Sequence, residues 1–344
     1  MTIQVVASEL LRKERPVWAF KEGVNLADHV VAITTADKKT VHEFIGTDDF
    51  AAAFYERQEY EVDAGRDEEP LLYQSLYSIT EDRNLPRNVP VNRVGPAGVV
   101  FEKVEEGGEV KFATVGQSNF SVPIYHYSVG LEYDDDLVEF NELWNLSEVE
   151  RQAGTAYNAL LNNIHLSPIL THTYAAKNQT DGTAITYDTN ALLPEKYLRA
   201  MEQAIIDAVG DATDPRRGPY ELVISTANLF TMERALTIVP QQGITLQSSA
   251  LSRIRRIIAY DGWTGTMGQK TTTYSGVAAG TAYLVDVGQK ARNMRSYVKH
   301  GLRRTMGNPD VSRFILEQTV WDSRLGTYAD IAAGVQEVTL PIAS

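Results

Sequence analysis

The chain has 344 residues, 43% of them hydrophobic, so it is long and apolar enough to form about two folded regions of roughly 150 residues each. Its 45 acidic and 32 basic residues give a formal net charge of −13, which argues against a surface built to bind nucleic acid, because such binding draws on Lys and Arg. The absence of cysteine excludes disulfides, thiolate metal sites and cysteine nucleophiles.

The N-terminal stretch "MTIQVVASELLRKERPVW" lacks the apolar core of a signal peptide, and its charges follow its apolar residues. No run in the chain approaches the roughly 18 apolar residues that span a bilayer. We therefore expect a soluble protein, made in the cytoplasm of the producing cell and without membrane contact.

The first third of the chain is predicted to be mostly extended or exposed. Residues 1–50 show no clear periodicity and are expected to form an arm. Residues 56–69 hold seven acidic residues and two arginines, which favours a solvated, mobile segment. The segment "VVFEKVEEGGEVKFATV" (99–115) alternates around Gly107-Gly108 and predicts a β-hairpin, which needs another surface because two-stranded ribbons are marginally stable in water.

A second strand pattern, "SVPIYHYSVGLEY", leads into "DDDLVEFNELW", where three aspartates raise the question of a metal site. Asp136 and Glu139 have the spacing of a capping box, and apolar residues follow at helical spacing. A calcium loop would need carboxylates on alternate residues and a Gly at its sixth position, so we interpret the motif as a helix start. A second capping box at Ser147 and Glu150 predicts a helix that ends before Pro168, with Gly154 allowing close approach of a neighbour.

The second half of the chain mixes helices and strands. We predict a helix over Pro194–Val209, with an apolar face of Tyr197, Leu198, Met201, Ile205 and Val209. "YELVIST" predicts a strand, after which Ser225 or Thr226 caps a helix over 227–236. "DPRRGP" is interpreted as a turn, "GVAAGTAYLVDVG" as a buried strand or strand pair, and "RLGT" (324–327) as a turn. Strands and helices without regular βαβ alternation predict an α+β fold.

No segment of the sequence fits a motif for catalysis or cofactor binding. "YDGWTGTMGQKTTT" departs from a phosphate-binding loop, because Gln269 separates Gly268 from Lys270, and we interpret it as a flexible surface loop. His165 and His172 lack zinc-site spacing, and there is no nucleophile elbow. A Ser/His/Asp arrangement stays open, since such residues meet only in the folded chain. We predict no catalytic, cofactor-binding or metal-binding residue.

The segment "VVFEKVEEGGEVKFATVGQSNFSVPIYHYSVGLEYDDDLVEFNELW", followed by "VERQAGTAYNALLNNI", resembles the major capsid protein of tailed bacteriophages, the Hong Kong 97-type fold. The order of elements agrees over about residues 50–344. The resemblance implies an N-terminal arm (1–50), an acidic segment with an extended loop (51–125), a peripheral domain with a long spine helix (126–219), an axial domain (220–300) and terminal strands of the peripheral domain (301–344).

The resemblance further implies a non-enzymatic subunit that assembles, as hexamers and pentamers, into the icosahedral head shell around double-stranded DNA. Such a protein is located in the virion head, is assembled in the host cytoplasm, and contacts DNA only weakly and without specificity. Its expected partners are a separate scaffolding protein, a portal and, in some particles, a decoration protein. One family member crosslinks a loop lysine to an asparagine; Lys103, Lys111 and Asn308 lie in the matching regions. The alternatives are an encapsulin-type compartment, or an unrelated α+β enzyme or binding protein.

Two charged stretches are candidates for an interface between subunits. The hairpin tip carries Glu102, Glu105, Glu106 and Glu109. The stretch "QKARNMRSYVKHGLRR" carries Lys290, Arg292, Arg295, Lys299, Arg303 and Arg304 without an intervening acid. Three alternatives are open for the basic stretch: internal ion pairs or a solvated face, contact with packaged DNA, or contact with the hairpin tip of a neighbouring subunit.

Overall fold

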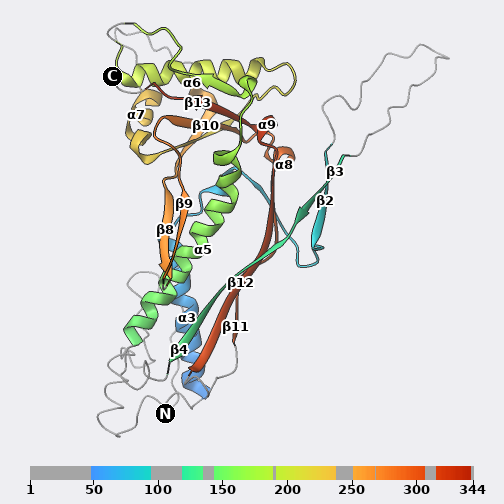
Figure 1. Cartoon of the computed structure of the whole chain (residues 1–344), viewed down its shortest axis with the longest axis vertical. Helices are drawn as coiled ribbons and strands as arrows, with labels where there is room; N and C mark the ends of the chain where they lie inside the picture. Colours follow the sequence, from blue (N-terminus) through green and yellow to red (C-terminus); the bar gives the residue numbers. More distant parts are fainter. Residues whose placement is uncertain are drawn as a thin grey trace, which may run out of the picture. The chain divides into compact units, whose positions relative to one another are not determined.

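The computed structural model describes residues 48–93, 118–134, 143–188, 191–237, 251–267, 269–306 and 315–341. The helices are α3 (Asp48–Glu68), α5 (Leu143–Thr171), α6 (Leu193–Gly210), α7 (Thr226–Thr237), α8 (Lys290–Asn293) and α9 (Ile331–Gly334), with 3₁₀ turns η1 (Tyr73–Ser75), η2 (Ala176–Asn178) and η3 (Leu251–Arg253). The strands are β1 (Ser78–Glu81), β2 (Asn88–Arg93), β3 (Ser118–Pro123), β4 (Tyr125–Asp134), β5 (Gln179–Asp181), β6 (Tyr220–Ile224), β7 (Ile254–Ala259), β8 (Gly262–Met267), β9 (Lys270–Ser275), β10 (Thr281–Asp286), β11 (Met294–Met306), β12 (Ile315–Ala329) and β13 (Val335–Thr339). The predicted α+β class is confirmed (Figure 1).

The chain forms two compact units from interleaved segments. The first unit combines residues 1–70, 128–160 and 302–322, and the second combines 71–127, 161–301 and 323–344. The strands form a four-stranded sheet (β1-β11-β12-β4), a five-stranded sheet (β5-β13-β10-β6-β7) and two two-stranded sheets (β2-β3 and β8-β9). The five-stranded sheet joins β5 and β13 to strands of 220–300, so it draws on three of the expected segments.

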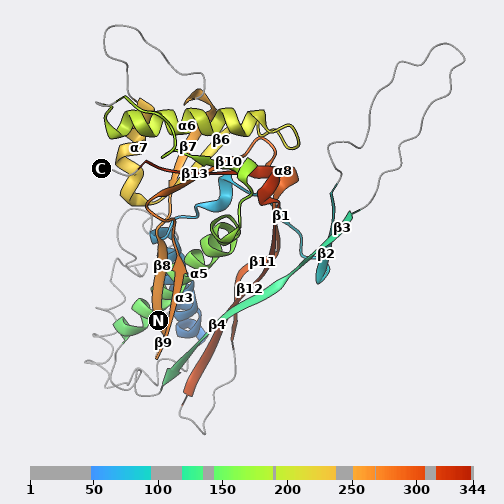
Figure 2. The same ribbon diagram turned by 45° about the horizontal axis from the view of Figure 1, so that its top comes forward.

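The main core of the second unit lies between the five-stranded sheet and helices α6 and α7 (Figures 1 and 2). The predicted strand at 220–224 is buried on both faces, as a central strand requires. The predicted helix at 194–209 is confirmed, but its buried face consists of Tyr197, Ala200, Met201, Ala204, Ile205 and Ala208. Val209 is 37% exposed, because the three alanines complete the buried face and let α6 approach the sheet closely.

Residues 56–68 belong to helix α3 in the first unit, and acidic side chains such as Glu59 and Asp63 are exposed, as expected for a solvated segment. Gln58, Val62 and Gly65 are buried and recur at helical spacing. A Cβ atom at Gly65 would overlap the carbonyl oxygen of Arg151, and one at Gly154 would overlap the carbonyl oxygen of Val62. The predicted close approach at Gly154 is therefore confirmed, and its partner is the acidic helix.

Helix α5 is longer at both ends than predicted. It begins at Leu143 and runs through Ser147 and Glu150 without a break, so the second capping box is not a helix start. It also continues through Pro168 to Thr171. An internal proline costs about 3 kcal/mol, but Leu166 and Ile169 are fully buried, and their packing stabilises the last turn.

One segment that was predicted as a loop and one that was predicted as a turn are strands in the structure. "GWTGTM" and "KTTTYS" pair as the antiparallel hairpin β8-β9, because Thr, Trp and Tyr favour extended backbone. "RLGT" lies inside β12 and is not a turn. Gly326 is needed there for another reason: a Cβ atom would overlap the carbonyl oxygen of Pro123.

Three predictions concern residues outside the described ranges: the arm, the hairpin at 99–115 and the capping box at Asp136. The strands that flank the hairpin segment are described. β2 and β3 pair antiparallel, with Arg93 opposite Ser118, so the intervening segment begins and ends at paired residues. Val89, Val91 and Val122 of this ribbon pack with Leu85 and Tyr297 in a small core of the second unit.

We expect Gly154→Ala to destabilise the packing of α3 on α5 by about 1–3 kcal/mol, because backbone must move to accept the new methyl group. Thermal unfolding followed by circular dichroism would show a lower midpoint with unchanged helical signal. Gly210→Ala is the matched control, since a Cβ atom at this last residue of α6 meets nothing within 4 Å. A Gly154→Ala chain as stable as the control would show that the glycine is incidental.

Candidate functional site

The described residues contain no group of three or more His, Asp or Glu side chains that could hold a metal ion. None of the helices in the described part of the chain is long and apolar enough to cross a membrane. The remaining candidates for a chemical role are the buried polar side chains, above all His165 and Arg216.

His165 of α5 is a core residue of the second unit. Its ring stacks on Tyr73 with centroids 3.6 Å apart and meets the edge of Tyr77 at 4.8 Å. Nδ1 lies 2.7 Å from the carbonyl oxygen of Leu161, and Nε2 lies 2.8 Å from Oγ of Ser296. Burial lowers the pKa of His165 to about 4, so the ring is neutral at pH 7. Both ring nitrogens are engaged, and the residue serves packing.

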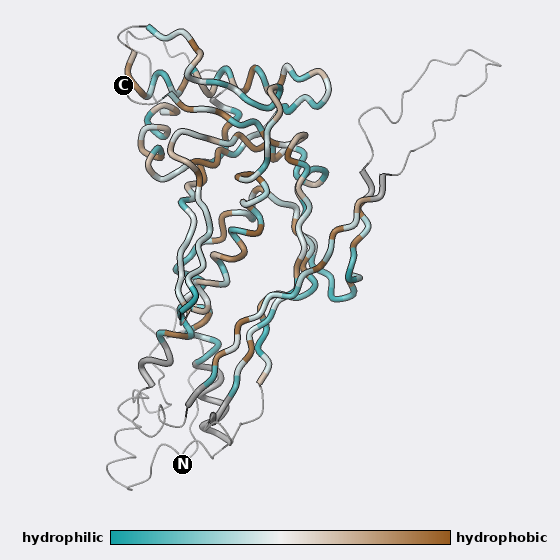
Figure 3. The backbone as a smooth tube through the Cα atoms, in the orientation of Figure 1, coloured by the Kyte–Doolittle hydropathy of each residue, from teal (hydrophilic) through white to brown (hydrophobic). Residues whose placement is uncertain are grey.

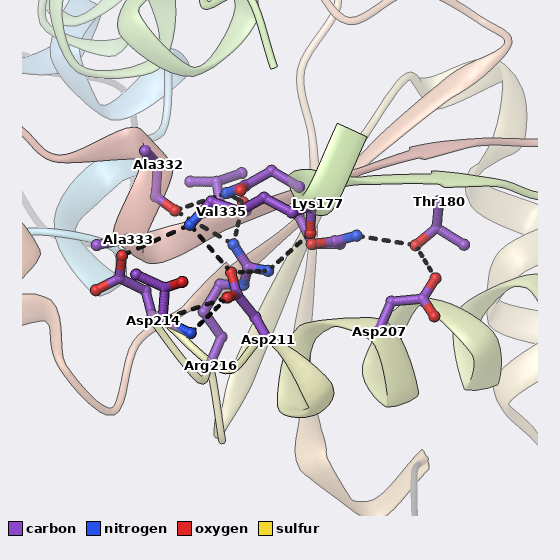
Figure 4. Close-up of polar contacts among 12 residues, drawn as sticks. Lys177, Thr180, Asp207, Asp211, Asp214, Arg216, Ala332, Ala333 and Val335 are labelled. Carbon is purple, nitrogen blue, oxygen red and sulfur yellow. Dashed lines mark hydrogen bonds and ion pairs between the residues drawn. The ribbon is translucent and has the colours of Figure 1, made fainter. Parts of the chain in front are cut away.

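A buried arginine is the centre of the most connected polar cluster (Figure 4). The Arg216 side chain is 1% exposed. Its Nη1 donates to the carbonyl oxygen of Ala332 at 3.2 Å, and its Nη2 donates to that of Lys177 at 3.3 Å and to Oδ2 of Asp211 at 3.4 Å. Asn178 donates to the same Ala332 carbonyl oxygen at 2.6 Å.

Within the cluster, the negative charge of Asp211 balances the positive charge of Arg216. Burial lowers the pKa of Arg216, while the nearby Asp211 carboxylate opposes this change. Burial alone would raise the pKa of Asp211, but hydrogen bonds from the backbone N–H groups of Thr213 and Asp214, and the charges of Lys177 and Arg216, lower it. The cluster joins η2, the end of α6 and the α9-β13 segment, so its role is to hold this part of the second unit together.

The sequence contains no local signal for this cluster. "DPRRGP" was interpreted as a turn, and it does contain no helix or strand. The two adjacent arginines differ in exposure, since Arg216 is buried and Arg217 is exposed. Only the tertiary structure separates them.

Replacing Arg216 with Met should cost about 3–5 kcal/mol of folding free energy, because buried Asp211 and the carbonyl oxygens of Ala332 and Lys177 would lose their buried donor. Only the partly exposed ammonium group of Lys177, 3.4 Å away, would remain as a cation beside Asp211. Arg217→Met is the matched control and should change stability by no more than about 0.5 kcal/mol, as is usual for exposed sites. Urea unfolding of both variants would measure the difference. Equal midpoints for the two would refute the structural role assigned to Arg216.

The predicted interface residues are placed only in part. Glu102, Glu105, Glu106 and Glu109 lie outside the described residues. The six cations lie along α8 and β11, as Lys290, Arg292, Arg295 and Lys299 in the second unit and Arg303 and Arg304 in the first.

Several of these cations already have partners within their own unit. Arg303 is 2.9 Å from Asp322, and Arg304 is 3.7 Å from Glu59. Lys299 donates to the carbonyl oxygen of Leu85 at 2.7 Å, and Lys290 to that of Ser75 at 3.2 Å. Arg295 donates only to the carbonyl oxygen of Ala291, four residues earlier, at 2.6 Å. Arg303 and Arg304 thus make internal ion pairs, whereas Lys290, Arg295 and Lys299 pair with no acid in the described ranges.

No protein-family model matches the sequence, and no curated protein matches it either. Solved structures are similar to it in fold. The capsid of the native GTA particle is 12% identical with a TM-score of 0.50, covering 79% of this chain and 90% of that chain. The capsid of Cyanophage P-SCSP1u is 11% identical with a TM-score of 0.50, covering 80% of this chain and 89% of that chain. The chain therefore has the fold of these capsid proteins, which confirms the predicted fold.

Proposed function

We propose that the chain is the major capsid protein of a tailed bacteriophage, the subunit of an icosahedral head shell around double-stranded DNA. The observation that carries the proposal is the fold shared with two capsid chains over about four fifths of this chain. The buried polar groups support it, since His165 and Arg216 serve packing. A shell subunit acts by association, so no catalytic turnover is proposed.

The arm, extended loop, peripheral domain and axial domain inferred from the sequence are part of this proposal. The antiparallel pairing of β2 with β3 supports an extended loop within the segment 51–125, because the chain leaves the end of β2 and returns beside it at the start of β3. Hexamers and pentamers of this chain, a scaffolding protein, a portal and the virion head as location belong to the same proposal. The competing function within this fold is a compartment that captures a fixed protein cargo.

The purified full chain should form closed shells, or hexameric and pentameric capsomers, in negative-stain electron microscopy at micromolar concentration. The same preparation should be tested with a crowding agent and with a co-expressed scaffolding candidate. A chain that stays strictly monomeric in all three conditions contradicts the proposal. Particles that always copurify with one companion enzyme, and never with DNA, would favour the compartment instead.

We further propose that the acidic hairpin tip of one subunit lies on the unpaired cations of α8 and β11 in its neighbour. The internal ion pairs of Arg303 and Arg304 leave Lys290, Arg292, Arg295 and Lys299 as the proposed receptor for the hairpin tip. Each exposed pair contributes only about 0–1 kcal/mol. Several pairs per subunit would nevertheless set register and assembly rate, and with a screening length of about 8 Å at physiological ionic strength, assembly should weaken as salt rises.

Reversing Glu105, Glu106 and Glu109 to Lys should block assembly, because like charges then meet at the contact. Adding Lys290→Glu and Arg295→Glu to the same chain should partly restore it, and these two cations have no ion pair to lose in the described ranges. Particle yield by light scattering measures both effects. Normal particles from the triple reversal alone would refute the contact.

A further inference from the structure

The β8-β9 hairpin is a two-stranded sheet that the proposed function leaves unexplained. Its strands pair from Gly262 opposite Ser275 to Met267 opposite Lys270, and neither strand has a second partner among the described strands. Isolated two-stranded sheets are marginally stable in water. The hairpin therefore needs support on at least one face or edge.

One face of the hairpin is supported from within. Trp263 and Tyr274 lie opposite each other on this face and stack with centroids 5.6 Å apart. The indole of Trp263 also covers Gly265, where a Cβ atom would overlap the ring. Both aromatic residues are partly buried. This face is the structural side of the hairpin.

The opposite face is exposed and consists of hydroxyl side chains. Its members are Thr264, Thr266, Thr271, Thr273 and Ser275, all exposed, and we call them the threonine face. The threonines pair across the strands, with Oγ1 atoms 3.3 Å apart between Thr264 and Thr273 and 3.1 Å apart between Thr266 and Thr271. The result is a regular two-by-two array of methyl and hydroxyl groups.

The threonine face carries no charge, although the chain has a net charge of −13 and 22% charged residues. Lys270 is the one charged residue of the two strands, and it lies on the Trp263 face. In Figure 3 the hairpin is white to teal over most of its length, so its residues are mostly intermediate to hydrophilic on the hydropathy scale. Contact surfaces between proteins are depleted in charge at their centres in the same way.

Strand β7 of the second unit is also exposed, and it has features that protect against association with another molecule. β7 is the edge of the five-stranded sheet, and it carries exposed Arg255 and Arg256 beside a register shift opposite Tyr220 and Glu221. Charged side chains and bulges are the usual means of keeping an edge strand from pairing with another molecule. The β8 and β9 strands lack a charge on their exposed face.

We propose that the threonine face packs against the same face of a second copy of the chain, across a two-fold axis. Such a contact places each residue near its own counterpart, so a face must be self-complementary. Threonine meets this condition, because its hydroxyl both donates and accepts and its methyl is apolar. Copies with a charge of −13 repel each other, which favours an uncharged surface at their contact. The inference rests on the proposed function, since a shell brings copies of the chain together.

The absence of native cysteine gives a direct test. Single variants Thr264→Cys, Thr266→Cys, Thr271→Cys and Thr273→Cys are made in the full chain. Each is treated, as assembled, with a bis-maleimide able to bridge about 10 Å, the usual spacing of packed sheets. Thr272→Cys is the matched control, since it has the same residue type in the same strand but lies on the Trp263 face. A monofunctional maleimide first establishes that every cysteine reacts.

At least one variant of the threonine face should give covalent dimers, and Thr272→Cys should not. Particles that form normally but yield no dimer from any of the four variants would overturn the inference and leave the proposed function intact. A wild-type chain without particles would instead overturn the proposed function. In that case dimers crosslinked in solution would still support the two-fold contact, and their absence would overturn it.

A second pair of variants separates this contact from a contact with a different surface. Thr266→Glu with Thr271→Glu places carboxylates on both sides of the two-fold axis, where like charges repel. Both pairs are made in a chain that also carries Thr264→Cys, so that the bis-maleimide has a thiol to bridge. The yield of covalent dimer should fall at least about tenfold relative to Thr266→Ser with Thr271→Ser. If the glutamates block assembly although no cysteine variant crosslinks, the threonine face meets another surface, and the self-contact is wrong.

Discussion

The backbone of α3 lies against the backbone of α5, and only glycine at positions 65 and 154 permits this distance. The contact also provides hydrogen bonds between the two helices. Oγ1 of Thr155 donates to the carbonyl oxygen of Gly65 at 3.0 Å, and Nδ2 of Asn158 donates to those of Arg66 and Glu69 at 2.6 and 2.8 Å. Carbonyl groups at a helix end have no partner in their own helix. One helix therefore satisfies the end of the other, and an acidic segment with few apolar residues becomes ordered.

The same dependence on exact partners recurs in the second unit around Arg216. A buried cation is costly without a carboxylate and hydrogen-bond acceptors, and here Asp211 and carbonyl oxygens from two distant segments supply them. Polar groups in both units thus tie together pieces of chain that are far apart in sequence. Such ties matter in this chain because each unit is built from segments that are separated in sequence.

Elements with strong local signals were predicted well from the sequence. α6 shows clear helical spacing, and β6 is apolar except for Glu221. Ser225 accepts from the N–H of Ala227 at the start of α7, as a capping residue does. α3 was not predicted because the buried residues of its described side chains, over 58–68, are Gln58, Val62 and Gly65, with one apolar side chain among them. "RLGT" was misread because a glycine needed for close passage of another strand looks, in sequence, like a glycine needed for a turn. Arg216 was missed because burial of one arginine of a pair leaves no local trace.

Charge and strand pairing together explain how a strongly acidic chain could associate with copies of itself. In the proposed shell, net repulsion between copies of the chain would oppose contact wherever carboxylates face each other. Association is then confined to the places where the surface is neutral or locally basic. Contacts of this kind are individually weak, and weakness is useful, because a subunit that docks wrongly can dissociate and dock again. A closed shell repeats each contact once for every subunit, so its stability comes from the number of contacts. The register of each contact is set by the few residues that can pair with only one partner.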